Sequence, residues 1–364
     1  MQREKNISIR AVAEGCFDGG GYAFCRLPGA SVYHYLAQAG MPEHLDTLHS
    51  WNGKSGYVVA PFHPHPSTPA LLIVPDLHET CTTPQSVTPH PVTATISDNG
   101  REQYAKAFSM CQELLNDGTC EKIVLSRRMH LNAEGTPNPV VLFQNACVAH
   151  PNHYVALWWT AETGLWLVAT PEVLLESDGH HWHTMALAGT EAWNGEHSVI
   201  DIEQWNEKNR REQQVVADEV AQRLHPYADH LETSPTYPCR AGNVVHLRTD
   251  FSFGLRASAT PLDIITDLHP TPAVCGVPRQ KALATILQAE AEPRRYYAGY
   301  SGMLTPEGHT HFYVSLRCLS VNADTITLYA GGGLLRSSNE AEEWEETERK
   351  LQTILQVLNP LIQS

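Results

Sequence analysis

The chain has 364 residues, of which 42% are hydrophobic and 18% are charged, and this balance excludes wholesale disorder. A chain of this length can bury a substantial core, in one large unit or in two domains. The 40 acidic residues outnumber the 25 lysines and arginines, giving a net charge of −15 with histidine neutral. That charge argues against a nucleic-acid-binding protein, which needs a basic face, but leaves room for local cations around an anionic small molecule.

The sequence has no segment typical of membrane insertion or secretion. Its longest apolar runs, residues 70–74 and 154–159, have the length of strands and are far below the ~20 residues that span a bilayer. The N-terminal residues contain no apolar stretch typical of a signal peptide. The nine cysteines form no C-x-x-C pair, so we expect reduced thiols in a cytoplasmic protein without membrane attachment.

Hydrophobic periodicity predicts many strands and a few separate helices. Short strands are expected before residue 78, and residues 79–97, rich in Thr and Pro, are expected to form a linker or an extended crossing. Further strands are expected at residues 122–131, 154–159, 164–169, 244–253, 312–321 and 325–330. Helices are expected at residues 98–115, 203–225, 278–290 and 339–358. Because no βαβ unit repeats, we predict an α+β fold with large, mostly antiparallel sheets.

The last predicted helix carries acidic side chains beside its apolar stripe. Ser337 and Glu340 have the spacing of a capping box, so the helix is expected to begin there. On a helical wheel, Glu343, Glu346 and Lys350 line one flank of the stripe. Two partly dehydrated carboxylates one turn apart repel each other unless a cation joins them. A divalent metal ion would do so; the alternative is an ordinary surface ion pair between Glu346 and Lys350.

The predicted helix at residues 203–225 shows a similar anomaly. Glu212 falls between Val215 and Val216 on the apolar side of this helix. A carboxylate on a core face needs a partner, which could be an arginine. If the two helices meet, Glu212 and Glu346 could instead share Mg²⁺, which prefers oxygen ligands.

Two cations and a glycine run lie on predicted strands. Lys122 begins a strand and could be a desolvated, neutral base, although a lysine at a strand start more often faces solvent. Arg317 shares a face with Tyr313 and Ser315, where it could bind a carboxylate or form a salt bridge at a sheet edge. The glycines of residues 330–335 would let backbone N–H groups approach an anion, but tight sheet packing explains them equally well.

Histidine is abundant, with 20 residues, and several histidines follow a predicted hairpin turn at Asp178-Gly179. His181 and His183 share a face and could bind a transition metal. The polar pattern around them favours an exposed strand instead.

Nine segments, taken in order, resemble the chorismate-utilising enzymes, a family that includes isochorismate, salicylate, anthranilate and aminodeoxychorismate synthases. The segments are KIVLSRR (122–128), ATPEVLLE (169–176), LAGT (187–190), KNRREQQVV (208–216), VVHL (244–247), LHPTPAVCGVPRQKA (268–282), YYAGYSG (296–302), VSLRC (314–318) and AGGGLLRSSNEAEEWEETERK (330–350). The resemblance implies a single large domain of two stacked sheets with outer helices, similar to anthranilate synthase component I. Residues 1–95 would be an N-terminal segment of the same unit, and residues 96–364 the chorismate-binding catalytic core.

The resemblance also implies Mg²⁺-dependent chemistry on chorismate, with roles for particular residues. Glu212 and Glu346 would bind the metal, with Glu343 adding a direct or water-mediated contact, and the metal would bind the ring carboxylate of chorismate. Arg317 would bind the pyruvyl carboxylate, with Tyr297 nearby. Other residues implied to surround the substrate are Thr190, His246, Ala273, Gly332, Gly333 and Lys350.

Further positions point to the type of reaction. Water-adding members of the family resemble this chain in having a lysine at the head of KIVLSR, so Lys122 would be the uncharged general base that activates water. Glu172 would be the general acid that protonates the departing C4 hydroxyl, which requires a raised pKa. Ala188 stands where aminodeoxychorismate synthases have a nucleophilic lysine. Ala273 and Val274 stand where salicylate synthases typically have Thr-Ala.

These features predict an isochorismate synthase that interconverts chorismate and isochorismate. Menaquinone and siderophore routes both begin with isochorismate, and we expect the menaquinone route. The alternatives are salicylate synthase, which goes on to eliminate pyruvate, anthranilate synthase, which needs ammonia or an amidotransferase subunit, and a catalytically silent binding protein. We expect a monomer without an amidotransferase subunit. Many family members have Glu-His where this chain has Glu212-Gln213, and this difference puts only the surroundings of the metal ligand in doubt.

Overall fold

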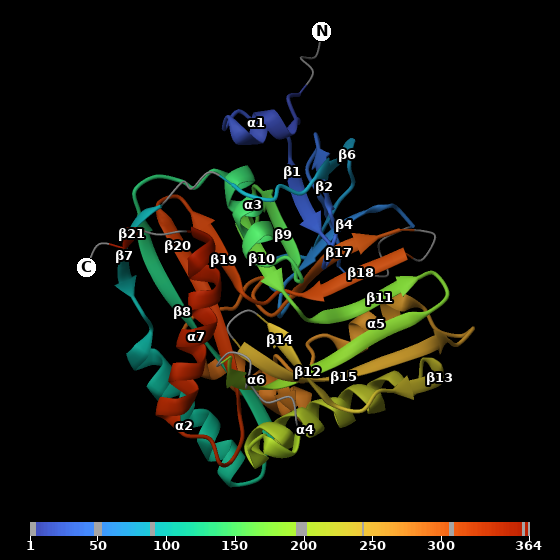
Figure 1. The fold of residues 1–364 in the computed structure, drawn as a ribbon, viewed down its shortest axis with the longest axis vertical. Helices are drawn as coiled ribbons and strands as arrows, with labels where there is room; N and C mark the ends of the chain where they lie inside the picture. The colour runs from blue at the N-terminus through green and yellow to red at the C-terminus, as the bar shows by residue number, and fades with distance from the viewer. Residues whose placement is uncertain are drawn as a thin grey trace.

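The computed structural model describes residues 5–46, 53–87, 92–193, 202–241, 244–305, 309–358 and 361–362. Two large sheets, named sheet A and sheet B below, form the centre of the molecule (Figure 1). No helix in these ranges is long and apolar enough to cross a membrane. The nine cysteines all lie in these ranges and form no disulfide.

Within the described ranges, sheet A has 11 strands. In spatial order, its main path is β21 (Leu361–Ile362), β7 (Thr93–Asp98), β8 (Lys122–Ala133), β20 (Thr325–Leu334), β19 (Cys318–Asn322), β10 (Gly164–Thr170), β9 (Tyr154–Thr160), β1 (Gly21–Arg26), β2 (Val32–Gln38) and β6 (Leu77–Thr82). The short strand β16 (Gly276–Val277) pairs with the beginning of β8.

Sheet B has 10 strands in the same part of the chain. Its main path is β13 (Ala228–Thr233), β15 (Val244–Leu255), β12 (Trp182–Ala192), β11 (Val173–Asp178), β18 (His309–Val314), β17 (Tyr300–Leu304), β4 (Gly56–Ala60), β5 (Leu71–Ile73) and β3 (Glu43–His44). Strand β14 (Tyr237–Ala241) pairs with β15. Between described strands, the pairing is antiparallel apart from β7 with β21, as the sequence predicts.

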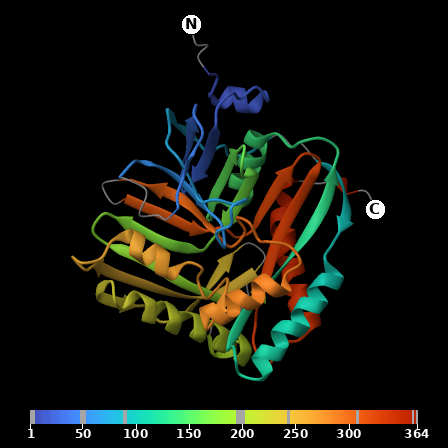
Figure 2. The ribbon, with the colours of Figure 1, turned by 180° about the vertical axis from the view of Figure 1, so that it is seen from behind.

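Helices lie outside the two sheets (Figures 1 and 2). They are α1 (Ile9–Ala13), α2 (Arg101–Asn116), α3 (Pro139–Ala149), α4 (Glu207–Leu224), α5 (Pro261–Leu268), α6 (Arg279–Ala289) and α7 (Glu340–Leu358), with a 3₁₀ turn at Ile202–Gln204. One hydrophobic cluster joins both sheets with α2, α4, α5 and α6. A second cluster packs α3 and α7 against sheet A. This is the predicted α+β fold, with a core between layers.

The first strands of the chain belong to both sheets. β1 pairs with β9 in sheet A, and β4 pairs with β17 in sheet B. Residues before 95 therefore pair with strands from the rest of the chain. The division of the chain near residue 95 stays a prediction.

The predicted linker at residues 79–97 is wrong at both of its ends. Strand β6 pairs with β2, and strand β7 pairs with β8. Its threonines are β-branched and favour strands, although the segment has few apolar residues to alternate with them. The short helices α1, α3 and α5 also lie outside the predicted elements. The sequence of α3 is apolar almost throughout, so it shows no stripe.

The expected strand at residues 312–321 is in fact two strands in different sheets. β18 ends at Val314 in sheet B, and β19 begins at Cys318 in sheet A. Arg317 lies in the crossing with a φ of +47°, so the prediction that it shares a strand face with Tyr313 and Ser315 is wrong. Both strands consist largely of buried residues. The sequence therefore shows one continuous apolar run and gives no sign that β18 ends and β19 begins within it.

Helix α7 begins at Glu340, but its cap differs from the prediction. The Asn339 side chain accepts hydrogen bonds from the backbone of Ala341 and Glu342. The Ser337 cap is therefore wrong. The helical wheel is right about the sides of the helix, because Glu343 and Glu346 are buried while Glu342 and Glu345 are exposed.

A bulge in β12 brings this strand against the first turn of α4. The register with β15 shifts between Ala188 and Thr190, and Gly189 between them has a φ of +68°. A Cβ on Gly189 would lie 2.8 Å from the backbone oxygen of Asn209. Glycine is therefore required both by the backbone and by the close approach of α4.

We expect Gly189→Ala to lower the free energy of unfolding, measured by urea denaturation, by more than the about 1–2 kcal/mol that the left-handed conformation alone costs. Gly164→Ala is the matched control, because Gly164 has a φ of +69° and its nearest atom to a new Cβ is 3.6 Å away. Equal losses in the two variants would show that contact with α4 does not matter.

Candidate active site

A cavity opens between the two sheets. It lies beside Arg317, in the segment that connects β18 of sheet B to β19 of sheet A. Its empty volume, mouth included, is about 620 Å³. The predicted site residues that line it are Glu172, Thr190, Glu212, His246, Ala273, Tyr297, Arg317, Gly333 and Lys350. The remaining predicted residues, Lys122, Gly332, Glu343 and Glu346, are outside this lining.

Lys122 and Glu212 form a buried pair beside the cavity. Lys122 begins β8 and has no exposed side-chain surface, so the alternative of a solvent-facing lysine is wrong. Its Nζ lies 3.0 Å from Oε1 of Glu212. The partner of Glu212 is thus a lysine rather than the arginine considered from the sequence. This contact joins the beginning of β8 to the first turns of α4.

The glycines of β20 leave space for carboxylates on both sides of the strand. A Cβ on Gly333 would lie 2.0 Å from Oε1 of Glu212, and one on Gly332 would lie 3.3 Å from Oε2 of Glu343 and 3.6 Å from Oε1 of Glu346. The pairing of β20 with β19 stops at Tyr329 with Cys318, so this part of β20 extends beyond β19. Glu212 from α4 therefore lies beside Gly333, and Glu343 and Glu346 from α7 lie beside Gly332.

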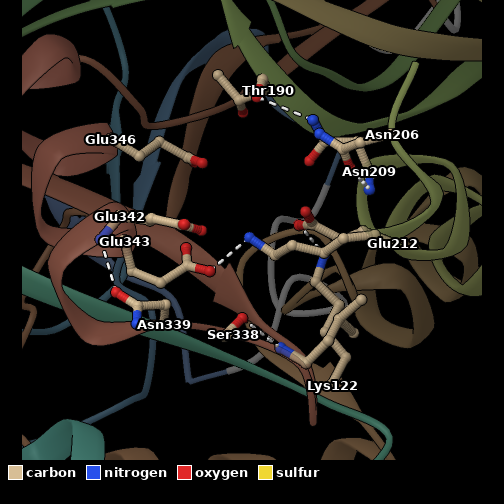
Figure 3. Close-up of polar contacts among 12 residues, drawn as sticks. Lys122, Thr190, Asn206, Asn209, Glu212, Ser338, Asn339, Glu342, Glu343 and Glu346 are labelled. Atoms are coloured by element: carbon tan, nitrogen blue, oxygen red, sulfur yellow. Dashed lines mark hydrogen bonds and ion pairs between the residues drawn. The ribbon is translucent and has the colours of Figure 1, made fainter. Parts of the chain in front are cut away.

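Each carboxylate of this group is paired with a lysine. Glu343 contacts Lys208 of α4, and Glu346 Oε1 accepts a 2.6 Å hydrogen bond from Lys350. The i,i+4 pair considered from the sequence is formed, but Glu346 is buried and Lys350 mostly so, which makes it no ordinary surface pair. Figure 3 shows Glu343 and Glu346 from one side facing Glu212 on the other.

The charges in this group shift several pKa values. Burial, and then the neighbouring Glu346, raise the pKa of Glu343 to about 7. Burial would also raise the pKa of Glu346, but Lys350 and Lys208 lower it. Burial alone would lower the pKa of Lys208, but attraction to Glu343, Glu212 and Glu346 raises it.

The three carboxylates are chemically suited to bind a hard divalent cation. Their side chains are not arranged around a single ion position, however. Carboxylate oxygens are the ligands that Mg²⁺ prefers. Among the described residues, Oε2 of Glu343 is buried without a hydrogen-bond partner. In the same ranges, however, no group of three or more His, Cys, Asp or Glu is placed to hold a metal ion. A metal at this position would therefore compete with the lysines for these carboxylates.

Glu172 lies at another wall of the cavity, at the turn before β11. It is 3% exposed, and its Oε1 accepts a 3.2 Å hydrogen bond from Thr271. Burial raises the pKa of Glu172 to about 7, against smaller opposing effects of Thr271 and Lys122. A carboxyl group in this environment can hold and donate a proton near neutral pH.

Arg317 points into the cavity from the crossing between the sheets. Its Nη2 lies 2.9 Å from Nε2 of His246, and the edge-strand salt bridge considered from the sequence is not formed. Burial and then Arg317 lower the pKa of His246 well below its usual value, so His246 is neutral. A guanidinium can only donate, hence Nε2 accepts and the proton is on Nδ1, which faces the Gly189 oxygen and Thr190 Oγ1, both at 3.2 Å. His246 thus orients Arg317 and leaves its other donors for an anion.

Gln213 has a structural role that the sequence did not reveal. Its Oε1 accepts from the Ala188 backbone at 2.8 Å, and its Nε2 donates to the Ala186 oxygen and to Thr249, both at 3.1 Å. These bonds fix α4 on strand β12. Gln213 therefore supports the neighbouring Glu212 without titrating.

Two residues of the site were not singled out from the sequence, although both lie in segments that carry the family resemblance. Lys208 begins KNRREQQVV, and Thr271 lies in LHPTPAVCGVPRQKA. A lysine in the first turn of a helix normally extends into solvent, and a threonine after Pro indicates a turn. Their partners, Glu343 and Glu172, are distant in sequence.

The histidines after the Asp178-Gly179 hairpin lie outside the cavity. His181 is exposed and contacts Asp178, while His183 lies 2.8 Å from Asp250. The expectation of an exposed strand is wrong, because β12 begins after His181, pairs with β11 and β15, and is mostly buried. The contacts of the two histidines give no support to a transition-metal site.

The sequence profile of the chorismate binding enzyme family matches residues 72–359. Isochorismate synthase EntC of Escherichia coli K12 is 32% identical over 250 residues, which cover 65% of this chain and 62% of that protein. Isochorismate synthase DhbC of Bacillus subtilis is 30% identical over 274 residues, which cover 71% of this chain and 68% of that protein. The chain thus matches less than two thirds of EntC.

Solved structures share the fold over nearly the whole chain. MenF, the menaquinone-specific isochorismate synthase of Escherichia coli, superposes with a TM-score of 0.81 and 21% identity, covering 97% of this chain and 92% of that one. Anthranilate synthase component I of Streptococcus pneumoniae superposes with a TM-score of 0.70 and 17% identity, covering 86% and 82%. Since the family profile extends over most of the sequence and both sheets, the chain belongs to the chorismate binding enzymes.

Proposed function

We propose that this protein is an isochorismate synthase, which converts chorismate reversibly to isochorismate with Mg²⁺ as cofactor. The observation that carries the proposal is Glu172, a buried carboxyl group with a pKa raised to about 7 in the same cavity as the cationic Arg317. The names of the relatives EntC and DhbC agree with this activity.

The reaction adds a water oxygen at ring carbon C2 and removes the hydroxyl at C4. Lys122, as general base, takes a proton from the water attacking C2, while the two conjugated ring double bonds move from C1–C2 and C5–C6 to C6–C1 and C4–C5. Glu172 gives its proton to the leaving C4 hydroxyl, which departs as water. One water enters and one leaves, so the overall reaction is an isomerisation. Arg317 holds the pyruvyl carboxylate, for which its guanidinium is suited.

The metal would be held by Glu212 and Glu346, with Glu343 in contact directly or through water. When bound, Mg²⁺ would compensate the charge of the ring carboxylate. Lys350 supports this arrangement, since it bonds both Glu346 and the backbone oxygen of Gly331. The remaining contacts assigned to the substrate come from Tyr297, Thr190, Ala273 and the Gly332–Gly333 backbone.

Two positions support water addition without further steps. Lys122 is buried beside Glu212, and Ala273 lines the cavity with a small apolar side chain. We therefore propose that the protein acts without an amidotransferase subunit and stops at isochorismate. The menaquinone route and a monomeric state remain predictions, since relatives are named both for menaquinone and for vibriobactin.

The test is chromatography of the products after incubation of the purified protein with chorismate, with Mg²⁺ or with EDTA. We expect isochorismate in equilibrium with chorismate, and loss of turnover on chelation that added Mg²⁺ restores. Salicylate with pyruvate would assign a salicylate synthase instead. Anthranilate formed only with ammonia would remove Lys122 from its role as base.

A further inference from the structure

Lys208 occupies an unusual place for a lysine in the first turn of a helix. Its side chain is 22% exposed and contacts Glu343, which is 1% exposed. Glu343 and Lys208 come from different helices, α7 and α4, so the pair joins them. Attraction to two further carboxylates, Glu212 and Glu346, also helps to raise the pKa of Lys208.

Each of the three carboxylates contacts a lysine. Lys122 contacts Glu212, Lys350 contacts Glu346, and Lys208 contacts Glu343. Lys122 has no exposed surface, and Lys350 is also bonded to the Gly331 oxygen. Lys208 reaches the group from the mouth of a neighbouring groove that includes Asn206, Arg211 and Glu342. Of the three lysines, Lys208 can therefore move its ammonium group away from its carboxylate with the smallest change to the surrounding contacts.

We propose that Lys208 is a built-in cation that holds Glu343 in the metal-free protein and is exchanged for the divalent ion when the metal binds. The inference deepens the proposed function, because it rests on the proposed metal site. An ammonium group and a divalent cation would compete for the same carboxylate, that of Glu343, and buried like charges repel strongly. Lys208 would therefore keep α4 and α7 together without metal and would lower the affinity for metal.

The exchange predicts opposite effects on stability and on metal affinity when the charge of Lys208 is removed. In EDTA, Glu343 would be left buried beside Glu346 without its cation, so the variant should unfold at a lower temperature. With its competitor gone, a divalent ion should bind more tightly, by on the order of tenfold or more. A lysine that merely bound substrate would change neither quantity in this way.

The experiment compares the full-length protein with Lys208→Met, without chorismate. Electron paramagnetic resonance counts free Mn²⁺, the probe ion, during titration, and circular dichroism gives Tm in EDTA and with saturating Mg²⁺. We expect a lower Tm in EDTA, a larger rise in Tm on adding Mg²⁺, and a Kd for Mn²⁺ lower by on the order of tenfold. Lys208→Arg keeps the charge and should retain an affinity close to that of the unchanged protein. Lys208→Gln replaces the methionine variant if that variant does not fold.

The outcomes separate this inference from the metal site itself. Equal Mn²⁺ affinity in the unchanged protein and in Lys208→Met, or weaker binding by the variant, would overturn the exchange while leaving the metal site in place. Absence of Mn²⁺ binding in both proteins would overturn the metal site proposed for Glu212, Glu343 and Glu346, and the exchange with it.

Discussion

Replacing Glu172 by glutamine is expected to lower kcat for isochorismate formation by about 10²–10⁴-fold, the usual contribution of a general acid. Glutamine keeps the size of the side chain and can still accept the hydrogen bond from Thr271, but it has no proton to give to the C4 hydroxyl. For the unchanged enzyme, kcat should fall as the pH rises through about 7, because the carboxyl group then loses its proton. The pH profile of kcat tests this, and a variant with unchanged turnover would remove Glu172 from the mechanism.

The same substitution is expected to stabilise the fold at alkaline pH. The folded-state pKa of Glu172 is about 7, above the value near 4.3 of an unfolded chain, so the folded protein binds this proton more tightly. Stability is therefore lost as the pH rises from about 4 to 7, by at most about 4 kcal/mol. Glu172→Gln removes this loss, and its Tm at pH 8 should be a few degrees higher than that of the unchanged protein.

Glu176, in strand β11 directly after Glu172, provides the matched control. Burial would raise the pKa of Glu176, but hydrogen bonds with His311 and Tyr313 lower it overall. Its carboxylate thus stabilises the fold above its unfolded pKa, and Glu176→Gln should lower Tm at pH 8. A rise in Tm for both variants would mean that loss of any negative charge stabilises this acidic protein, and the buried state of Glu172 would not be the cause.

The sequence was most informative about the acidic side chains of helices α4 and α7. The wheel placed Glu212, Glu343 and Glu346 on buried sides because a carboxylate on an apolar flank breaks the 3.6-residue pattern, and all three are buried. In β8, Lys122 and Val124 are two residues apart and so share a face; Lys122 is fully buried, and Val124 lines the cavity. Local periodicity carries this kind of information, because it reports which side of an element faces the interior.

What the sequence could not provide depends on contacts between distant segments. Arg317 was placed on a strand face, yet it lies at the point where the chain leaves sheet B for sheet A, and its orientation depends on His246, 71 residues away in the chain. Lys208 looked like a solvent-exposed residue because its partner, Glu343, is on the other helix. Such pairings follow from the topology of the sheets, which no single segment encodes.

Gly333→Ala is expected to lower kcat/KM by at least about 10²-fold, as a small displacement of catalytic groups can do. The new Cβ would lie 2.0 Å from Oε1 of Glu212 and 2.8 Å from Cε of Lys122, so both side chains would have to move. Gly333 has no positive φ, and alanine is therefore allowed by the backbone. The far-ultraviolet circular dichroism spectrum should stay unchanged while turnover and Mn²⁺ affinity both fall.

Gly332→Ala is the neighbouring control on the opposite side of the same strand. Its Cβ would be 3.3 Å from Oε2 of Glu343 and 3.6 Å from Oε1 of Glu346, distances that a slight shift of Glu343 can accommodate. We therefore expect a clearly smaller loss of activity than in Gly333→Ala, with a Tm close to that of the unchanged protein. If the two alanine variants lost activity equally, the contact between Glu212 and Lys122 would not be the part of the site that Gly333 protects.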